Sequence, residues 1–284
     1  LIEKREKRLG GAANVALNIQ ALGATPIPCA VIGDDDAGQF FLNRLAERGI
    51  SAEGIVTSTE RPTTIKERVL SDDKQVLRVD SETDKTLSAH EQTQLLEKAK
   101  KLLPLCQVVI FQDYDKGVIN ADIIEAMVMA AKELGIPTVV DPKKRNFLAY
   151  KYVTLFKPNL KELKEGLDIE VDPTDLDSLN QGVLKLTSKL DCDQVMVTLS
   201  EHGVFIKNET ESFKLAAHKR QINDVSGAGD TVISIAALAL ALGLDSNQIA
   251  AISNLGGGLV CEHVGVVPID KDSLLSEVER EIKF

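Results

Sequence analysis

The chain has 284 residues, with 33 Lys and Arg against 43 Asp and Glu, so its formal net charge is −10 and its pI is about 5.0. A chain of this length suits one large α/β domain and buries about three quarters of its unfolded surface. An acidic surface repels nucleic-acid phosphates and anionic lipids, so we expect neither nucleic acid nor a membrane as a partner.

The cysteines and histidines argue against a disulfide framework and a transition-metal site. The four cysteines are far apart in sequence, which suits reduced, buried thiols. They are Cys29, Cys106, Cys192 and Cys261. The four histidines show no ligand spacing. Neither a signal-peptide pattern nor an unbroken apolar run of about 18 residues occurs in the printed sequence, and we therefore expect a cytoplasmic protein.

The first predicted elements alternate between helix and strand. Helical spacing of apolar residues, closed by Gly23, predicts a helix over Asn14–Leu22. The apolar run Pro28–Gly33 predicts a strand. A second helical pattern predicts a helix over Asp36–Arg48 that ends at Gly49.

The segment from Ile55 to Asp80 breaks this alternation. Its apolar residues recur at period two, and Ser71-Asp72-Asp73-Lys74 has the composition of a turn, so the segment predicts antiparallel strands. An antiparallel insertion in a parallel-sheet protein is a candidate lid or dimer contact.

The alternation resumes at residue 108. The predicted elements are strand Val108–Gln112, helix Ala121–Leu134, strand Thr138–Asp141, strand Leu155–Lys157, helix Leu160–Gly166, helix Asp175–Leu190, strand Gln194–Thr198, a hairpin over Gly203–Asn223, helix Thr231–Leu242 and helix Ala250–Cys261. The pattern predicts one domain over residues 1–284, with a mostly parallel sheet between two helical layers in an α/β/α arrangement.

Polar residues follow five predicted strands, at the edge where doubly wound sheets bind ligands. These stretches are Gly33-Asp34-Asp35, Gln112 to Gly117, Asp141-Pro142-Lys143, Lys157 to Glu162, and Thr198 to Gly203. Each alone is typical of helix caps and turns. Together they indicate the rim of an active site.

A sixth polar turn, Asp224-Val-Ser-Gly-Ala-Gly-Asp230, comes later in the chain and directly precedes an apolar helix. A flexible Gly-Ala-Gly turn at a helix start points backbone N–H groups at one place, where the helix dipole also favours an anion. A carboxylate in that position would take a proton from an attacking hydroxyl while the N–H groups stabilise the transferring charge. This division of labour describes phosphoryl transfer to an alcohol.

Two segments carry a family resemblance. Gly10-Gly11-Ala-Ala-Asn14 near the start and Asp224 to Asp230 near the end, here called the two signature segments, resemble the paired signatures of the ribokinase-like carbohydrate kinases, the phosphofructokinase-B family. Between them, Asn159-x-x-Glu162 resembles that family's magnesium and phosphate element. Thr198-Leu-Ser200-x-x-Gly203 is similar to its nucleotide loop, with Ser200 in place of a glycine.

Longer strings resemble the kinase domain of the bacterial enzymes that phosphorylate D-glycero-D-manno-heptose 7-phosphate at O1. They are Leu9 to Asn18, Arg61 to Val69, Gln75 to Asp80, Asp113 to Val118, and Asp141-Pro142-Lys143. The resemblance implies a ribokinase-like fold, ATP and Mg²⁺ as cofactors, and a role in the ADP-heptose route to lipopolysaccharide. Members of that family often carry a fused adenylyltransferase domain.

The implied site has a catalytic, a sugar and a nucleotide part. The catalytic part is Asp230 as base with the N–H groups of Gly227, Ala228 and Gly229. The sugar part is Gly10, Gly11, Asn14 and Asp113, with Lys66, Arg68, Arg78 and Lys116 as candidate cations for a substrate phosphate. The nucleotide part is Lys143, Asn159, Thr198, Ser200, Gly203, Asn254 and Gly257. Mg²⁺ is expected near Asn159 and Glu162 through water, and Asp224 is a candidate for a monovalent cation such as K⁺.

Several alternatives stay open at this stage. Asn14 could cap a helix, and the lid cations could only keep an edge strand soluble. The enzyme could be another sugar kinase of the family, acting on a fructose phosphate, ribose or a nucleoside, or the chain could bind sugar or nucleotide without catalysis. A Rossmann-type nicotinamide site is disfavoured because no strand runs into Gly-x-Gly-x-x-Gly.

Two further expectations come from the family. Its members open with a strand that carries a substrate-binding Asp, whereas Gly10 is here preceded by nine residues. We therefore expect that strand to be missing from this sequence. Lid strands in the family often meet in a dimer, so we expect a homodimer through the β lid.

Overall fold

We describe the protein from a computed structural model, which covers residues 6–71 and 74–282. The described helices are α1 Ala12–Ala21, α2 Asp36–Glu47, α3 Ala89–Leu102, α4 Ala121–Glu133, α5 Leu160–Leu167, α6 Leu176–Leu190, α7 Ala228–Ala241, α8 Ser246–Val260 and α9 Lys271–Glu281. The strands are β1 Ala30–Gly33, β2 Ile55–Ser58, β3 Ile65–Ser71, β4 Lys74–Ser81, β5 Val109–Gln112, β6 Thr138–Asp141, β7 Leu155–Phe156, β8 Gln194–Thr198, β9 Val204–Lys207 and β10 Ser212–Leu215.

The central sheet has six strands in the order β10-β9-β8-β7-β6-β5. Strands β5 to β8 pair in parallel, and β9 pairs antiparallel with both β8 and β10. The prediction of a mostly parallel sheet is therefore confirmed. The predicted hairpin is confirmed over residues 204–215, whereas residues 216–223 form a loop.

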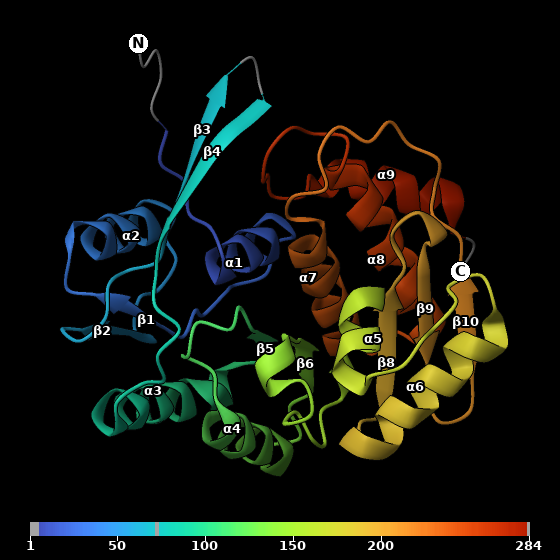
Figure 1. Ribbon diagram of the computed structural model, residues 1–284, viewed down its shortest axis with the longest axis horizontal. Coiled ribbons are helices and arrows are strands. Elements are labelled where there is room, and N and C mark those ends of the chain that lie inside the picture. Colours follow the sequence, from blue (N-terminus) through green and yellow to red (C-terminus); the bar gives the residue numbers. More distant parts are fainter. Residues whose placement is uncertain (1–5, 72–73, 283–284) are drawn as a thin grey trace.

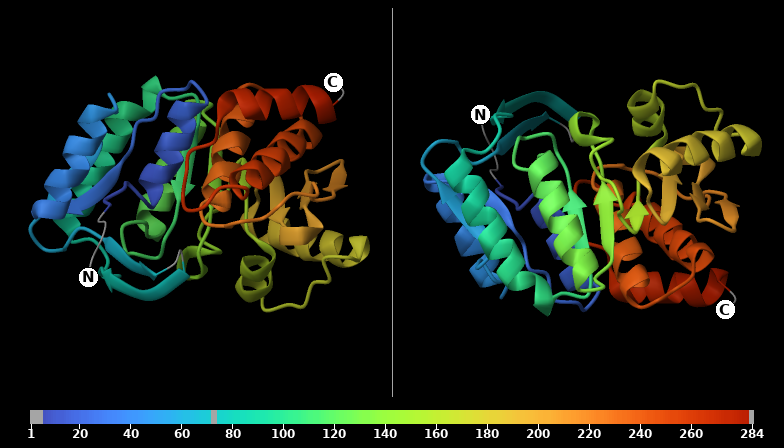
Figure 2. Two further views of the ribbon diagram at one scale, coloured as in Figure 1. Left: turned by 90° about the horizontal axis from the view of Figure 1, so that it is seen from above. Right: turned by 90° about the horizontal axis from the view of Figure 1, so that it is seen from below.

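Helices cover both faces of this sheet because its strands are apolar on both sides. Val139 of β6 and Met196 of β8 pack with α1, α7 and α8. Their neighbours Val140 and Val197 point the opposite way, into a core shared with α3, α4, α5 and α6. Figure 2 shows α8 and α9 in red and α6 in yellow on opposite sides of the strands, which confirms the three-layer arrangement.

The segment predicted as antiparallel strands divides into two structures. The prediction of an antiparallel strand is wrong for Ile55–Ser58. These residues form β2, which pairs in parallel with β1 in a separate two-stranded sheet. The remainder is confirmed, since β3 and β4 pair antiparallel. Figure 1 shows this hairpin standing clear of the rest of the molecule. The tip of the predicted turn, residues 72 and 73, lies outside the described residues.

Two helices were not predicted from the sequence. Helix α3 starts with a capping box, in which Ser88 accepts the N–H of Glu91 and the Glu91 carboxylate accepts the N–H of Ser88. Helix α9 starts behind Asp270, whose side chain accepts the N–H of Ser273. Both caps are visible in the sequence.

The cysteines and the helix lengths can be compared with what the composition predicted. All four cysteines are free, as predicted, although Cys29 is exposed and only Cys192 and Cys261 are buried. In the part of the chain that the structure describes, no helix is both long and apolar enough to cross a membrane.

Candidate active site

Asp230 lies where segments from opposite ends of the chain meet. It belongs to the first turn of α7, and its Oδ2 accepts a hydrogen bond of 2.7 Å from Nδ2 of Asn14 in α1. Its Oδ1 accepts two more, from the Tyr114 hydroxyl at 2.9 Å and the Gln112 amide at 3.2 Å. The two signature segments are therefore in direct contact.

The turn before α7 has the backbone that its glycines predict. Gly227, the N-cap, has φ 86°, and a Cβ there would lie 3.1 Å from Val266. No side chain caps the helix, which leaves first-turn N–H groups without a side-chain acceptor. The N–H of Ala228 already donates to the Val225 carbonyl, but over a long 3.3 Å. The turn therefore presents a helix N-terminus suited to an anion.

Burial changes the proton affinity of the carboxylate. Loss of water raises the pKa of Asp230, while the hydrogen bonds from Asn14 and Tyr114 act in the opposite direction. The charge of Asp141 adds to the rise and that of Lys157 opposes it. A base with a raised pKa is better matched to accepting a proton near neutral pH.

A buried ion-pair group lies beside Asp230, at the ends of β6 and β7. Asp141, 5% exposed, is 3.4 Å from the ammonium of Lys157, which is itself only 2% exposed. The Gln112 amide donates both to Asp141 and to Asp230, so it ties this group to the helix start. Lys143 also lies 3.8 Å from Asp141. The sequence predicted Asp141 and Lys157 in the polar rim but assigned an individual role only to Lys143.

The predicted nucleotide residues at the ends of β7 and β8 lie next to each other. Asn159 forms a β-bridge with Thr198, although 39 residues separate them in the chain. Asn159 and Glu162 form the capping box of α5, each side chain accepting the other's backbone N–H. Glu162 also forms an ion pair with Lys143. Although burial acts against it, the charges of Asp141 and Glu162 raise the pKa of Lys143, so it is a cation at this edge.

The loop after β8 has positive φ angles at Ser200 and Gly203, two of its predicted nucleotide residues. Ser200 has φ 54° and lies in a 3₁₀ turn over Ser200–His202. Gly203 has φ 87°, and a Cβ there would meet the Leu215 carbonyl at 2.0 Å. Only glycine fits position 203, which supports the predicted importance of that residue in shaping the loop. Ser200 is exposed, as a ligand contact requires.

A loop covers the face of α8 where the nucleotide base was predicted. The Asn254 amide donates to the Ala216 carbonyl at 2.8 Å, and Gly257 is buried against α7. Further along, Arg220 crosses α8 at Gly258. Asn254 is therefore already engaged by the protein.

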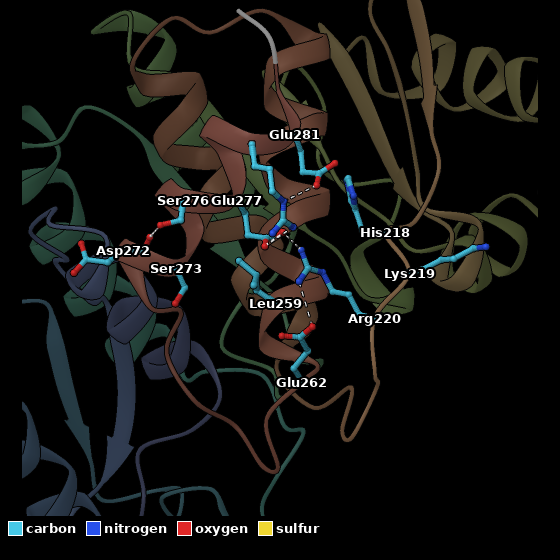
Figure 3. Close-up of a pocket in the computed structure, with 11 residues that line it drawn as sticks. His218, Lys219, Arg220, Leu259, Glu262, Asp272, Ser273, Ser276, Glu277 and Glu281 are labelled. Atoms are coloured by element: carbon cyan, nitrogen blue, oxygen red, sulfur yellow. Dashed lines mark hydrogen bonds and ion pairs between the residues drawn. The ribbon is translucent and has the colours of Figure 1, made fainter.

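A cavity of about 860 Å³ lies beyond this loop, between residues 218–220 and α9 (Figure 3). Arg220 forms ion pairs there with Glu262 and Glu277. The lining holds several carboxylates and cations but neither Asp230 nor any residue of the signature segments. We therefore place no chemistry in this cavity.

Three of the four candidate phosphate cations are already paired with carboxylates. Lys66 of β3 lies 2.7 Å from Glu82, and Lys116 in the loop after β5 lies 2.5 Å from the same carboxylate. Arg78 of β4 pairs with Asp80 at 2.7 Å. Lys66 and Lys116 thus meet as the sequence predicts, with an internal carboxylate between them that it did not predict.

Arg68 of the lid hairpin acts through its charge on Asp224, in the turn before α7. The N–H groups of Ser226 and Gly265 donate to Asp224 at 2.9 Å each. These bonds, the one from Ser226 above all, and the charge of Arg68 hold the pKa of Asp224 below its usual range. Arg68 therefore reaches the neighbourhood of the active-site turn.

Two predicted sugar contacts are engaged within the protein. Asp113 is 2% exposed and accepts hydrogen bonds from Tyr150 and Asn146, so it is part of the core. Asn14 does not cap a helix, since Gly11 is the N-cap of α1, and its Nδ2 donates to Asp230.

The glycine pair Gly10 and Gly11, predicted as part of the sugar site, lies at the surface. Gly10 is exposed, and a Cβ there would meet nothing within 4 Å. Gly11 has φ 58° and faces the ring of Tyr114, to which a Cβ would come within 3.7 Å. The pair therefore opens a surface beside Asp230.

Metal ligands are sparse around this site. No group of three or more His, Cys, Asp or Glu residues in the described chain is placed to hold a metal ion. Mg²⁺ that arrives with phosphates takes only one or two protein carboxylates, so the residues at this edge fit it.

A comparison with protein families decides the class. The profile described as pfkB family carbohydrate kinase matches residues 1–272. The chain belongs to the pfkB family of carbohydrate kinases. It is therefore a phosphotransferase, as the sequence predicted.

Curated relatives of this pfkB chain are named bifunctional protein HldE. The protein from Desulfatibacillum aliphaticivorans is 34% identical over 279 residues, which are 98% of this chain and 57% of that protein. The one from Methylobacillus flagellatus is 36% identical over 282 residues, 99% of this chain and 57% of that protein. The chain thus spans little more than half the length of the curated relatives it matches.

Solved structures confirm the ribokinase-like fold of this pfkB protein. Phosphofructokinase-2 from Escherichia coli in complex with potassium has a TM-score of 0.79 at 19% identity, over 97% of this chain and 91% of that one. Ribokinase from Arabidopsis thaliana complexed with ribose and ATP has a TM-score of 0.72 at 18% identity, over 93% and 85%. At this level of identity the likeness shows the fold alone.

Proposed function

We propose that the protein transfers the γ-phosphoryl group of ATP to the O1 hydroxyl of D-glycero-D-manno-heptose 7-phosphate. The observation that carries the reaction type is the contact of Asp230 with Asn14 at an uncapped helix start. The sugar is supported by the resemblance of the longer strings and by identity of about 35% to the HldE relatives. The product would serve ADP-heptose synthesis, and the free thiols suit a cytoplasmic enzyme.

Asp230 acts as the general base. Its carboxylate accepts the proton of the sugar hydroxyl as the oxygen forms a bond to the γ-phosphorus, and the bond to the β–γ bridging oxygen breaks to release ADP. The N–H groups of Gly227 and Gly229, with the dipole of α7, stabilise the charge on the transferring group. Lys143 is positioned to contact the ATP phosphates.

Asn159 and Glu162 would hold Mg²⁺ through water at the edge beside Lys143. When bound, the ion neutralises charge on the triphosphate. Glu162 is a carboxylate already oriented by the N–H of Asn159 and by Lys143, so it presents a fixed negative charge there. The carboxylate of Asp224, kept ionised by two N–H donors, is the proposed site for K⁺.

The cationic face of the lid supports a phosphorylated substrate. Arg68 and Arg78 are directly opposite each other on β3 and β4, an arrangement that destabilises a two-stranded sheet unless an anion lies between them. Lys66 lies on the same face, since it pairs with Asp80 and successive cross-strand pairs alternate between faces. A neutral sugar would need none of these charges.

A substrate panel with ATP and Mg²⁺ tests the proposal. We expect turnover of heptose 7-phosphate with a kcat/KM at least tenfold above that of fructose 1-phosphate, fructose 6-phosphate, ribose or a nucleoside, because about 1.4 kcal/mol of selective contact suffices for that factor. Turnover of another sugar with heptose 7-phosphate inert would refute the substrate. Binding of sugar or nucleotide without any turnover would refute the activity.

The β3–β4 hairpin is proposed to pair with a second copy of the chain. The face opposite the cations carries the cross-strand pair Val69 and Leu77, 52% and 54% exposed, and Val79, 45% exposed. An isolated two-stranded hairpin is marginal in water, and an apolar face of this kind needs a cover. The same face on a second lid supplies one, because a two-fold interface is self-complementary.

Leu77→Lys should convert a dimer into a monomer, because it places a charge in the middle of this apolar face. Light scattering after size-exclusion chromatography measures the mass directly. Leu105→Lys is the matched control, since Leu105 is 65% exposed outside the lid and should leave the dimer intact. A monomeric parent protein, or a dimer that survives Leu77→Lys, contradicts the proposed interface.

A further inference from the structure

The Tyr114 side chain lies between the two signature segments. Its hydroxyl donates to Oδ1 of Asp230 at 2.9 Å, and its ring faces Gly11. Gly11 opens α1 and Asp230 opens α7, whereas Tyr114 comes from the loop after β5. Tyr114 is half-buried, and its ring faces the exposed glycine pair.

Counting acceptor positions shows how little of Asp230 is left for a substrate. An ionised carboxylate has about four lone-pair sites. One is taken by Asn14 on Oδ2, and two by Gln112 and Tyr114 on Oδ1. One position remains to accept the proton of an attacking hydroxyl. The donors therefore decide which lone pair of the base faces the substrate.

The charged groups around Asp230 act in both directions. Asp141 at the end of β6 raises the pKa of Asp230, and Lys157 behind β7 lowers it. Asn14 and Gln112 are neutral donors from α1 and β5. Burial and the charge of Asp230 raise the pKa of Tyr114, so the phenol keeps its proton and remains a donor. Tyr114 is thus an uncharged donor whose acidity can be changed by substitution on its ring without changing the charge of the site.

We propose that Tyr114 is a positioning residue that keeps Asp230 ionised and leaves a single lone pair aimed at the sugar hydroxyl. The inference rests on the proposed role of Asp230 as base. It assigns Tyr114 a task that Asp113, its neighbour in the sequence, cannot perform from the core. A hydrogen bond to the charged form favours that form, so its loss makes the base easier to protonate.

The chain offers a matched control for this bond. Tyr150 donates to Oδ2 of Asp113 at 2.8 Å, which is also a phenol-to-carboxylate bond, but both residues are buried in the core. Removing either hydroxyl deletes the same chemical group. Only the removal at Tyr114 should change the proton affinity of the base.

The test compares pH–rate profiles of Tyr114→Phe and Tyr150→Phe on heptose 7-phosphate. Activity needs ionised Asp230, so it falls as the pH drops through the pKa of this group. Tyr114→Phe should raise that pKa and move the acid limb of kcat and kcat/KM up by about one pH unit, with less than about a threefold loss above the limb. Tyr150→Phe should leave the acid limb in place. Titration of the substrate phosphate affects both variants equally, so the comparison between them cancels it.

A second measurement uses a stronger donor at the same position. Replacing Tyr114 by 3-fluorotyrosine keeps the shape and acidifies the phenol, so the acid limb should move to lower pH. An unmoved limb in both variants, or an equal loss of activity at every pH, overturns the inference. Retained turnover in Asp230→Asn would instead overturn the proposed function, so the two failures are distinguishable.

Discussion

Replacing Asp230 by asparagine should lower kcat by about a thousandfold and leave the affinity for ATP within about a factor of two. The amide keeps the size of the carboxylate, and its oxygen can still accept the hydrogen bonds from Tyr114 and Gln112, while its NH2 group takes the place of the oxygen that faces Asn14. It cannot accept the proton of the sugar hydroxyl. Because the proton moves only in the transition state, the loss should fall on kcat rather than on binding.

Steady-state kinetics with heptose 7-phosphate and calorimetric ATP binding measure the two quantities. Asp122→Asn is the matched control, because Asp122 is also an acidic residue in the first turn of a helix, α4, but lies outside the site. It should keep full turnover. Full activity in Asp230→Asn, or an equal loss in both variants, contradicts the assignment of the base.

The sequence predicted the central sheet and its helices well, because strong apolar runs with glycine stops define them. Residues Ile55–Ser58 were predicted to pair antiparallel within the lid segment, but they form β2, which pairs in parallel with β1. A period of two in the sequence shows only that the backbone is extended. Pairing direction depends on where the partner strand lies. The partner, β1, is about 25 residues earlier and is joined to β2 through α2.

Asp113 was named from the sequence and its neighbour Tyr114 was given no role, although both stand in the same string that resembles the heptose kinases. The alternation of β5, continued past its end, places Ile110 on the side of α7 and Phe111 in the opposite core. By the same period, Gln112 and Tyr114 share the side of Asp230, and Asp113 does not. The strand period was the signal that separates the site from the core.

The pairing of the lid cations could not be predicted. Glu82 follows the predicted lid and carries no motif, yet it bridges lysines that are 50 residues apart. Lys66, Glu82 and Lys116 come together only because the lid hairpin folds against the loop after β5. Charge counts along a sequence do not reveal such compensation.

The double substitution of Lys66 and Lys116 by methionine should raise the KM for heptose 7-phosphate by about a hundredfold or more. Each lysine is expected to make a charge-assisted hydrogen bond to the substrate phosphate, and each such bond contributes about 1.5–3 kcal/mol. The change also leaves Glu82 unpaired, and its carboxylate then repels a phosphate. Methionine keeps the length of the lysine stem, so packing changes little.

Two comparisons make this second prediction specific. The KM for ATP should stay within about twofold, because both lysines pair with Glu82, whereas Lys143 of the nucleotide edge pairs with Glu162. Turnover of the same heptose without its 7-phosphate should be slow in the parent enzyme and no slower in the variant. Lys98→Met, an exposed lysine of α3 bound to the Glu53 carbonyl, is the control for charge alone.

An unchanged KM for heptose 7-phosphate in the double variant would mean that Lys66 and Lys116 serve only to bind Glu82. The phosphate would then have to be recognised elsewhere, with Arg68 and Arg78 as the remaining cations of the lid face. Because a phosphate dianion and Glu82 compete for the same two ammonium groups, Glu82→Gln should in contrast lower the KM. Opposite shifts in the two variants would establish that an internal carboxylate stands where the substrate phosphate binds.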